Sequence, residues 1–388
     1  MIFFPDIAKN LLDNRMFQLP AYKVNAKAFG LKGAYVPWEV GFTGGFARDN
    51  EINHREVHVA ADVALFVKQY CQMTQNSSAL KKYFPLLEGV SDFVVSRVNR
   101  TDEDGWLSVE NVVAPDESTG RNDVNNDIFT NAAGVQALET TLQAVASLSL
   151  SVSQTKLDVW RRAAEKLKLH LEVFQGRLLH KEYDQYTFSE GVNDTHTSHP
   201  SIGQGDTVLL GFPLQFNESH RLWGGRKEEV RLNDISYYGP RVSPTGSYMT
   251  AGHYVIAWLE RPHRDLDNAA AWFQKGRAKN YAPWRIWSEH DENDGGAVNF
   301  ITAGGMFLQS LVFGYGGIRF NDHGISMDPV LPPGVTAMKF RGLNYADAEF
   351  DVDVSGGDAR FSRRVRDEDS GVVVVRRGAT DASYLLTQ

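Results

Sequence analysis

Apolar residues recur every three to four positions through most of the chain, which is the spacing of amphipathic helices. Val59, Val63, Phe66 and Tyr70 place one apolar stripe on a helix over about residues 55–75. A second helix is predicted over Leu80–Val98, after the start signal Asn76–Ser78. Further helices are predicted over residues 126–150, 248–260, 266–279 and 300–312, and over one face formed by Leu157, Trp160, Ala164, Leu167, Leu171 and Phe174. The pattern indicates a mainly α fold built from helix pairs.

Beyond about Gly317 the pattern changes to alternating or β-branched runs separated by Gly and Asp. Residues 338–340, 348–354 and 372–375 are therefore predicted as antiparallel strands. This change divides the chain into a helical domain over residues 1–317 and a small β-sheet domain over residues 318–388. The loops at 100–126, 183–206 and 280–299 are rich in aromatic residues and carboxylates, so we expect them to form the walls of a cleft.

Composition narrows the choice of partner. The net charge of −8 and pI near 5.8 argue against a nucleic-acid partner, which normally requires clustered Lys and Arg. Apolar stretches are too short for a membrane-spanning helix, so no membrane partner is predicted. The single cysteine, Cys71, fits a reducing compartment, and with no targeting signal visible we expect a cytoplasmic location. No cofactor or metal motif is found, and the oligomeric state is not encoded.

Two short acidic segments carry candidate chemistry. Ala114–Glu117 follows a turn-rich stretch, and Trp287–Glu289 is flanked by aromatic residues. A desolvated carboxyl can hold a proton while a hydrated one stays ionised, so such a pair can act as acid and base. A lone glutamate more often caps a helix or pairs with arginine, but the aromatic loops here favour chemistry on a sugar, whose faces stack on rings. Carbohydrate is the substrate class that these residues favour.

Four stretches together resemble glycoside hydrolase family 65, and the resemblance extends over about residues 1–350. They are Gly33–Glu39, Glu56–Val59, Ala114–Glu117 with Asn125–Asn126 and Phe129–Asn131, and Gln204–Gly211. The family includes acid trehalases, phosphorylases of α-linked disaccharides and a glucosidase acting on glucosylgalactosyl-hydroxylysine of collagen. The resemblance implies an (α/α)6 barrel followed by a small antiparallel β-sheet domain. The resemblance does not include the β-sandwich that precedes the barrel in the family, so we expect this domain to be absent.

The resemblance also implies roles for individual residues. Glu117 stands at the position of the general acid, which protonates the glycosidic oxygen. Trp38 and Glu39 match residues that hold the glucose, as does Gln204, although Gly203 replaces the lysine expected beside it. Glu289, in a segment similar to the hydroxylysine-glucosidase branch, matches the base of the hydrolytic members. The implied activity is inverting hydrolysis of a terminal α-linked glucose, for example from a hydroxylysine glycoside derived from collagen.

Two alternatives stay open. The chain could be an acid trehalase or a disaccharide phosphorylase of the same family. It could also be a non-catalytic carbohydrate-binding remnant, because the family has an upstream Trp-Asp motif, whose Asp binds glucose, just before the segment that Met1–Pro5 matches. We therefore expect the chain to be shortened at its amino terminus.

Several other polar residues have structural interpretations as well as functional ones. His58 could line the cleft or be a satisfied structural histidine, and it is left out of the catalytic set. His253 could belong to a phosphate site, but its surroundings are closer to those of the hydrolases. Asp116 is expected to orient the loop that carries Glu117. His290, Asp291, Glu292 and Asp294 have no metal-ligand spacing and are interpreted as a solvated acidic loop.

Overall fold

The computed structural model describes residues 1–117, 123–190, 202–244, 246–290, 296–322, 324–364, 374–377 and 384–387. The chain forms two compact units. The helical unit comprises Leu12–Val67 and Ser78–Gly246, and the sheet unit comprises Met1–Leu11, Lys68–Ser77 and Ser247–Gln388. The predicted domain division at residue 317 stays a prediction.

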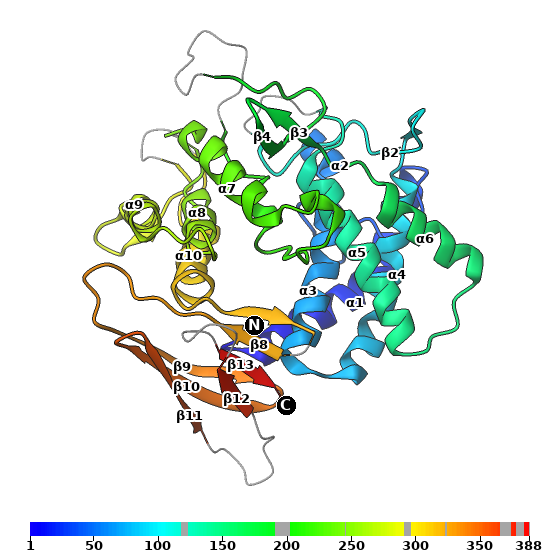
Figure 1. The fold of residues 1–388 in the computed structure, drawn as a ribbon. Helices are drawn as coiled ribbons and strands as arrows, with labels where there is room; N and C mark the ends of the chain where they lie inside the picture. The colour runs from blue at the N-terminus through cyan, green and yellow to red at the C-terminus, as the bar shows by residue number, and fades with distance from the viewer. Residues whose placement is uncertain are drawn as a thin grey trace. The chain divides into compact units, whose positions relative to one another are not determined.

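The described part of the chain is mainly helical (Figure 1). Its α-helices are α1 (Pro5–Ala28), α2 (Glu51–Arg55), α3 (His58–Thr74), α4 (Ser77–Ser96), α5 (Ile128–Ser147), α6 (Gln154–Lys166), α7 (Lys227–Tyr238), α8 (Thr250–Trp258), α9 (Leu266–Arg277) and α10 (Ile301–Gln309). Short 3-10 helices are η2 (Val208–Leu210), η3 (Arg221–Trp223) and η4 (Gly239–Arg241), and α10 continues as the π-helix η5 (Ser310–Tyr315). None of the helices in these described ranges has the length and apolar character needed to cross a bilayer.

Helix α5 forms the core of the helical unit and is buried on nearly every side. Small residues allow its neighbours to approach closely, as where Gly134 faces Val94 of α4. A polar pair also lies in this core, where the Ser91 hydroxyl donates to Thr141 Oγ1 at 2.7 Å. A narrow stripe of α5, at Glu139, Gln143 and Ser147, reaches the surface, and most of the helix packs against its neighbours. Figure 1 shows α4, α5 and α6 as neighbours.

The predicted helix through Leu171 and Phe174 is wrong. Helix α6 ends at Lys166, and Leu171–Phe174 is strand β3, paired antiparallel with β4 (Arg177–His180). The turn between them is Gln175–Gly176, both at positive φ, which is the two-residue turn that suits a hairpin. Turn chemistry and the β-forming Val173 and Phe174 outweigh the helical spacing. The remaining predicted helices are confirmed, while α1, α2 and α7 were not predicted.

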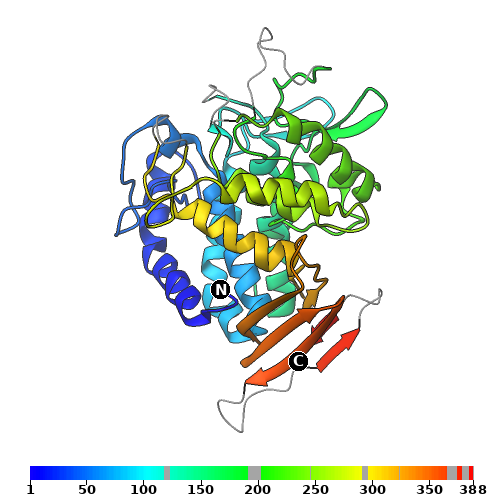
Figure 2. The ribbon, with the colours of Figure 1, turned by 90° about the vertical axis from the view of Figure 1, so that its left-hand side faces the viewer.

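The antiparallel strands predicted beyond residue 317 are confirmed where the structure describes them. Strands β7 (Arg319–Asn321), β8 (Gly324–Met327), β12 (Val374–Arg377) and β13 (Tyr384–Thr387) form one sheet in the order β12-β13-β8-β7, and β9 (Ala337–Tyr345), β10 (Ala348–Ser355) and β11 (Asp358–Arg364) form another. Figure 2 shows these strands in orange to red. Two-residue turns at Ala346–Asp347 and Gly356–Gly357, all at positive φ, connect β9, β10 and β11. Val372 and Val373 lie outside the described residues.

The rest of the sheet unit is a packed set of helices. Tyr254 of α8 stacks on Trp272 of α9, with ring centroids 4.3 Å apart and planes at 14°. Phe273 of α9 likewise stacks on Phe307 of α10.

Short two-stranded hairpins occur in both units. The helical unit contains β1 (Arg100–Thr101) paired with β2 (Leu107–Ser108), in addition to β3 with β4, and the sheet unit contains β5 (Asn280–Tyr281) paired with β6 (Ile286–Trp287). The last of these hairpins leads directly to Glu289.

The segment that carries Trp38 leaves α1 through a very close contact with α4. Gly33 has φ +81°, and a Cβ atom added there would lie 2.3 Å from the carbonyl oxygen of Gly89. The Ala34 amide then donates to that same carbonyl at 2.7 Å. Only glycine allows both the backbone conformation and the approach, so Gly33 fixes the path of the following residues.

We expect Gly33→Ala to destabilise the protein by about 3 kcal/mol or more, because it combines positive-φ strain with a backbone clash. The matched control is Gly30→Ala: Gly30 has φ +70° with nothing within 4 Å of the added Cβ. That variant should lose only about 1–2 kcal/mol. Urea denaturation of both variants measures the difference, and equal losses would contradict a role for the contact with α4.

Candidate active site

The Trp38–Glu39 segment is held by buried polar contacts in the helical unit. Tyr35 stacks on Phe93 of α4 and donates its hydroxyl to the Asn53 carbonyl at 2.9 Å. The side-chain oxygen of Asn53 accepts from the Glu39 amide at 2.7 Å. These bonds fix the backbone at Glu39 while leaving the Trp38 ring 40% exposed. An exposed indole on a fixed backbone is a suitable platform for the face of a sugar.

The Glu39 carboxylate lies 3.1 Å from the Arg48 guanidinium, across the turn that follows. The turn is closed by the Val40–Phe46 bridge and by the Ala47 amide, which donates to the Glu39 carbonyl at 2.9 Å. A half-buried carboxyl group in such a contact can still accept hydrogen bonds from sugar hydroxyls. Glu39 is therefore oriented without being fully enclosed.

His58 pairs with two acidic side chains near this segment: Glu56, which is buried, and Asp62, which is 36% exposed. Its ring nitrogens lie 2.9 Å from Glu56 and 2.7 Å from Asp62. Burial alone would lower the pKa of His58, but Asp62 and Glu56 outweigh it and hold that pKa well above its usual value. Glu56 in turn interacts with the Trp38 side chain by a hydrogen bond. The structure thus gives His58 the supporting role of a buried cation behind Trp38.

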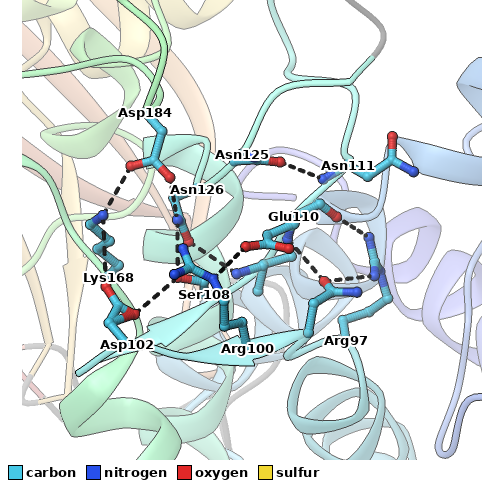
Figure 3. A network of polar contacts seen from close by, with 12 residues as sticks. Arg97, Arg100, Asp102, Ser108, Glu110, Asn111, Asn125, Asn126, Lys168 and Asp184 are labelled. Atoms are coloured by element: carbon cyan, nitrogen blue, oxygen red, sulfur yellow. Dashed lines mark hydrogen bonds and ion pairs between the residues drawn. The ribbon is translucent and has the colours of Figure 1, made fainter. Parts of the chain in front are cut away.

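The loop that carries Glu117 is closed at its base by paired backbone. Val112 and Val124 exchange both amide hydrogen bonds, at 2.9 and 3.0 Å. Next to this pair, the Asn125 side chain accepts from the Asn111 amide at 2.9 Å (Figure 3). The backbone ends of the loop are therefore fixed, and Glu117 lies half-buried in the described part of it.

A network of polar side chains supports this base (Figure 3). Asn126, at φ +52°, donates to Ser108 at 3.2 Å and to Asp184 at 2.8 Å. Lys168 completes the network with a 3.0 Å bond to Asp184. The contacts hold Asn126 in a left-handed conformation that asparagine tolerates better than most residues. Helix α5 begins immediately afterwards, with Asp127 as its N-cap.

Asp116 orients the loop, as predicted from the sequence. Its carboxylate accepts from the Gly203 amide at 2.9 Å, and its own amide donates to Asp206 at 3.3 Å. Asp116 and Asp206 are both fully buried. Gln204 is half-buried. In the sequence it stands between Gly203 and Asp206, the two residues that bond to Asp116. The residues predicted as general acid and as sugar ligand therefore belong to two loops that are bonded together.

Four buried carboxyl groups lie close enough to influence one another in this region: Asp116, Asp127, Glu182 and Asp206. Burial, followed by repulsion from Asp206 and Asp116, raises the pKa of Glu182 well above its usual value. Burial and neighbouring carboxylates act the same way on Asp206, and burial raises the pKa of Asp127 to about 6. Neither oxygen of Glu182 has a hydrogen-bond partner among the described residues. Burial and mutual repulsion therefore favour the protonated forms of Glu182, Asp206 and Asp127 more than solvent would.

Glu289 belongs to the sheet unit and follows strand β6. Its amide donates to the Ala297 carbonyl at 3.0 Å, and the Ala297 amide donates to Glu289 Oε2 at 2.9 Å. The second oxygen, Oε1, lies 3.7 Å from the His290 ring nitrogen. The carboxyl group is about 29% exposed, so one oxygen is fixed and the other can reach a water molecule.

The structure brings Trp38, Glu39, Glu117 and Gln204 into the helical unit and places Glu289 in the sheet unit. The roles of all five residues, and the spacing of the two catalytic carboxyls, stay predictions. Asp291, Glu292 and Asp294 lie outside the described residues. Within the part of the chain that is described, no three His, Cys, Asp or Glu side chains are arranged to hold a metal ion.

Sequence reasoning missed Glu182 and Asp127. Asp127 could have been found, because an aspartate directly before a helical apolar run is a typical N-cap. Glu182 follows a strand in an ordinary polar context, and only the tertiary fold shows that it is 1% exposed. Its burial among other acids is a property of packing that no local pattern encodes.

Comparison with known proteins identifies the class to which this fold and site belong. Residues 1–200 match the model of the glycosyl hydrolase family 65 central catalytic domain. The chain is 31% identical over 386 residues to protein-glucosylgalactosylhydroxylysine glucosidase of Danio rerio, covering 98% of this chain and 54% of that protein. The Dictyostelium discoideum protein of the same name is 33% identical over 353 residues, covering 88% of this chain and 45% of the relative. The chain belongs to glycosyl hydrolase family 65.

A solved structure provisionally assigned as a kojibiose phosphorylase from the human microbiome has the same fold. It superimposes with a TM-score of 0.77 at 17% identity, covering 99% of this chain and 53% of that one. This likeness confirms the predicted mainly helical fold with small antiparallel sheets. The chain spans about half the length of the curated relatives it matches.

The buried acids make stability depend on pH. Because the pKa of folded Glu182 lies above its ordinary value of 4.5, the folded state keeps a proton that the unfolded state releases. Stability is therefore lost as pH rises from about 4.5 towards the folded pKa. Glu182→Gln mimics the protonated acid, so it should match the wild type near pH 4 and exceed it at pH 8 by on the order of 1–3 kcal/mol.

Urea denaturation from pH 4 to pH 8 measures this difference. The control is Glu172→Gln, the same exchange at an exposed site on β3, which should follow the wild-type curve at every pH. A Glu182→Gln variant that is less stable than the wild type at pH 8 would show that Glu182 is buried as a charged, satisfied carboxylate.

Proposed function

We propose that this chain is the catalytic region of an inverting glycoside hydrolase that removes a terminal α-linked glucose. The substrate we favour is glucosyl-galactosyl-hydroxylysine, as found in collagen, or a related α-1,2-linked glucoside. The observation that carries the proposal is the 31% identity across 98% of this chain with a glucosidase named for that substrate. An alignment of that extent runs through both the Glu117 and the Glu289 segments.

In this proposal Glu117 is the general acid. It protonates the glycosidic oxygen while the bond from that oxygen to the anomeric carbon breaks. Support comes from its place on a loop that is fixed at its base, and from its half-buried position next to Asp116.

Glu289 is the proposed general base. The Ala297 amide orients one of its oxygens, which leaves the other to take a proton from the attacking water. We propose that the helices form an (α/α)6 barrel and that the mechanism is inverting. Inverting glycosidases separate their acid and base by about 6.5–9.5 Å, which admits a water molecule and inverts the anomeric centre.

The remaining predicted residues would hold the glucose. The exposed Trp38 ring offers a stacking face, and the Glu39 carboxylate offers an acceptor to two neighbouring hydroxyls. Gln204 adds an amide that can donate and accept. Because Gly203 takes the place of a lysine expected beside it, recognition on this side depends on Gln204 without a cation.

A disaccharide phosphorylase is the less favoured alternative. A bound phosphate would need a positively charged site, and His253 is the candidate residue for that site. Burial lowers the pKa of His253 to about 4, so its imidazole is neutral at physiological pH. A neutral ring attracts phosphate less than a cation would, which supports water as the nucleophile.

We expect Glu117→Gln and Glu289→Gln each to reduce glucose release from an α-1,2-linked glucosyl-galactoside by about 10²–10⁴-fold or more. Both changes are isosteric, so the unfolding temperature should stay close to that of the wild type. Glu172→Gln is the control, because it makes the same exchange at an exposed glutamate of the helical unit. Proton NMR of the first product distinguishes the anomers, and β-glucose is expected.

Other results would redirect the assignment. Release of α-glucose would exclude inversion, and undiminished turnover by Glu289→Gln would remove its assignment as base. Formation of glucose 1-phosphate only when phosphate is present would identify a phosphorylase. Sugar binding without release would support the carbohydrate-binding remnant.

A further inference from the structure

Two buried aspartates interlock the loop of Glu117 with the loop of Gln204. The Asp116 carboxylate accepts from the Gly203 amide at 2.9 Å, and the Asp206 carboxylate accepts from the Asp116 amide at 3.3 Å. Each bond joins a carboxylate of one loop to the backbone of the other. Asp116 takes part in both, through its side chain and through its amide.

The positions of these bonds in the sequence matter for function. Asp116 immediately precedes Glu117, while Gly203 and Asp206 flank Gln204 on both sides. A movement of the backbone at Gln204 is therefore transmitted to the residue next to Glu117. Each loop is also fixed elsewhere, by the Val112–Val124 pair and by the Ile202–Val242 bridge. The interlock thus connects two supported segments and is well placed to transmit small shifts.

Burial and neighbouring charges make the loss of either hydrogen bond strongly unfavourable in free energy. Asp116 is 0% and Asp206 is 1% exposed, and Asp206 Oδ1 has no partner among the described residues. Glu182, Asp127 and the His58 cation also act on this pair. Removing an amide donor from a buried carboxylate leaves it with no water to replace the bond. The pair consequently favours one arrangement of the two loops.

We propose that Asp116 and Asp206 form a positioning pair that couples glucose binding at Gln204 to the placement of the Glu117 proton donor. This rests on the proposed function, because it assigns no new reaction and explains how the acid and the sugar site act together. Neither aspartate contacts the reacting atoms. Their effect is carried by the Gly203 and Asp116 amides.

Steady-state kinetics with two substrates test the coupling. Asp116→Ala should lower kcat/KM for the α-1,2-linked glucosyl-galactoside by about 10- to 100-fold, the usual effect of losing a hydrogen bond to a charged group. Asp116→Asn keeps an acceptor for the Gly203 amide and should recover most of the loss. With α-glucosyl fluoride, whose leaving group needs no proton, the loss in kcat should shrink while the rise in KM persists.

A double-mutant cycle adds a second measure. If the pair acts through Gln204, the effects of Asp116→Ala and Gln204→Ala on kcat/KM should be less than additive. The control is Asp234→Asn, which alters a buried aspartate that binds His180 and should leave the ratio of the two substrates unchanged. Equal losses on both substrates, no recovery by Asp116→Asn, or strict additivity would each overturn the proposal.

Hydrogen exchange tests the pair without relying on turnover. Asp116→Ala should speed exchange of the Gly203 amide, and Asp206→Ala should speed exchange of the Asp116 amide. Glucose at saturating concentration should slow exchange at Asp116 in the wild type and not in Asp206→Ala. Absence of this glucose effect in the wild type would overturn the coupling. Its presence in a protein that hydrolyses no α-glucoside would support the coupling and reject the proposed hydrolysis.

Discussion

Burying several carboxyl groups in one small region is the constraint on which the helical unit depends. Asp116, Asp127, Glu182 and Asp206 cannot all be ionised out of reach of water, because mutual repulsion adds to the cost of desolvation. The structure balances them with backbone amide donors, with raised pKa values and with the nearby His58 cation. These contacts connect separate segments of the chain to the four carboxyl groups. The same interactions that stabilise the buried acids therefore also fix the arrangement of the loops.

That arrangement also fixes the backbone of the loop segment next to Glu117, the proposed general acid. General acid catalysis needs a carboxyl placed within hydrogen-bond reach of a defined oxygen. Here the loop base is paired at Val112 and Val124, and its tip region is bonded through Asp116. Rigid supports of this kind lower the reorganisation needed when substrate binds. Support of the candidate site comes from contacts that are buried and polar, which differ from the apolar packing around α5.

The sequence predicted the periodic helices and strands well, and the buried polar side chains poorly. Helical spacing located α3, α4 and α5, and β-branched alternation located β9 and β10, because a single buried face dictates those patterns. It failed at Leu171–Phe174, where a Gln175–Gly176 turn and pairing with β4 override a fortuitous helical spacing. The role of Asp116 in orienting its loop was predicted correctly. Glu182 could not be found, since its burial arises from segments that are distant in sequence.

The paired backbone at Val112 and Val124 has a consequence for how specificity can change. A loop whose two ends are hydrogen-bonded to each other can be exchanged or lengthened at small entropic cost, because the closure is already made. Helix α5, Asp127 and Glu182 lie outside the closed loop, whereas Asp116 and Glu117 lie within it. The length of the loop can therefore change at its surface without disturbing the helical core, provided that these two residues are kept.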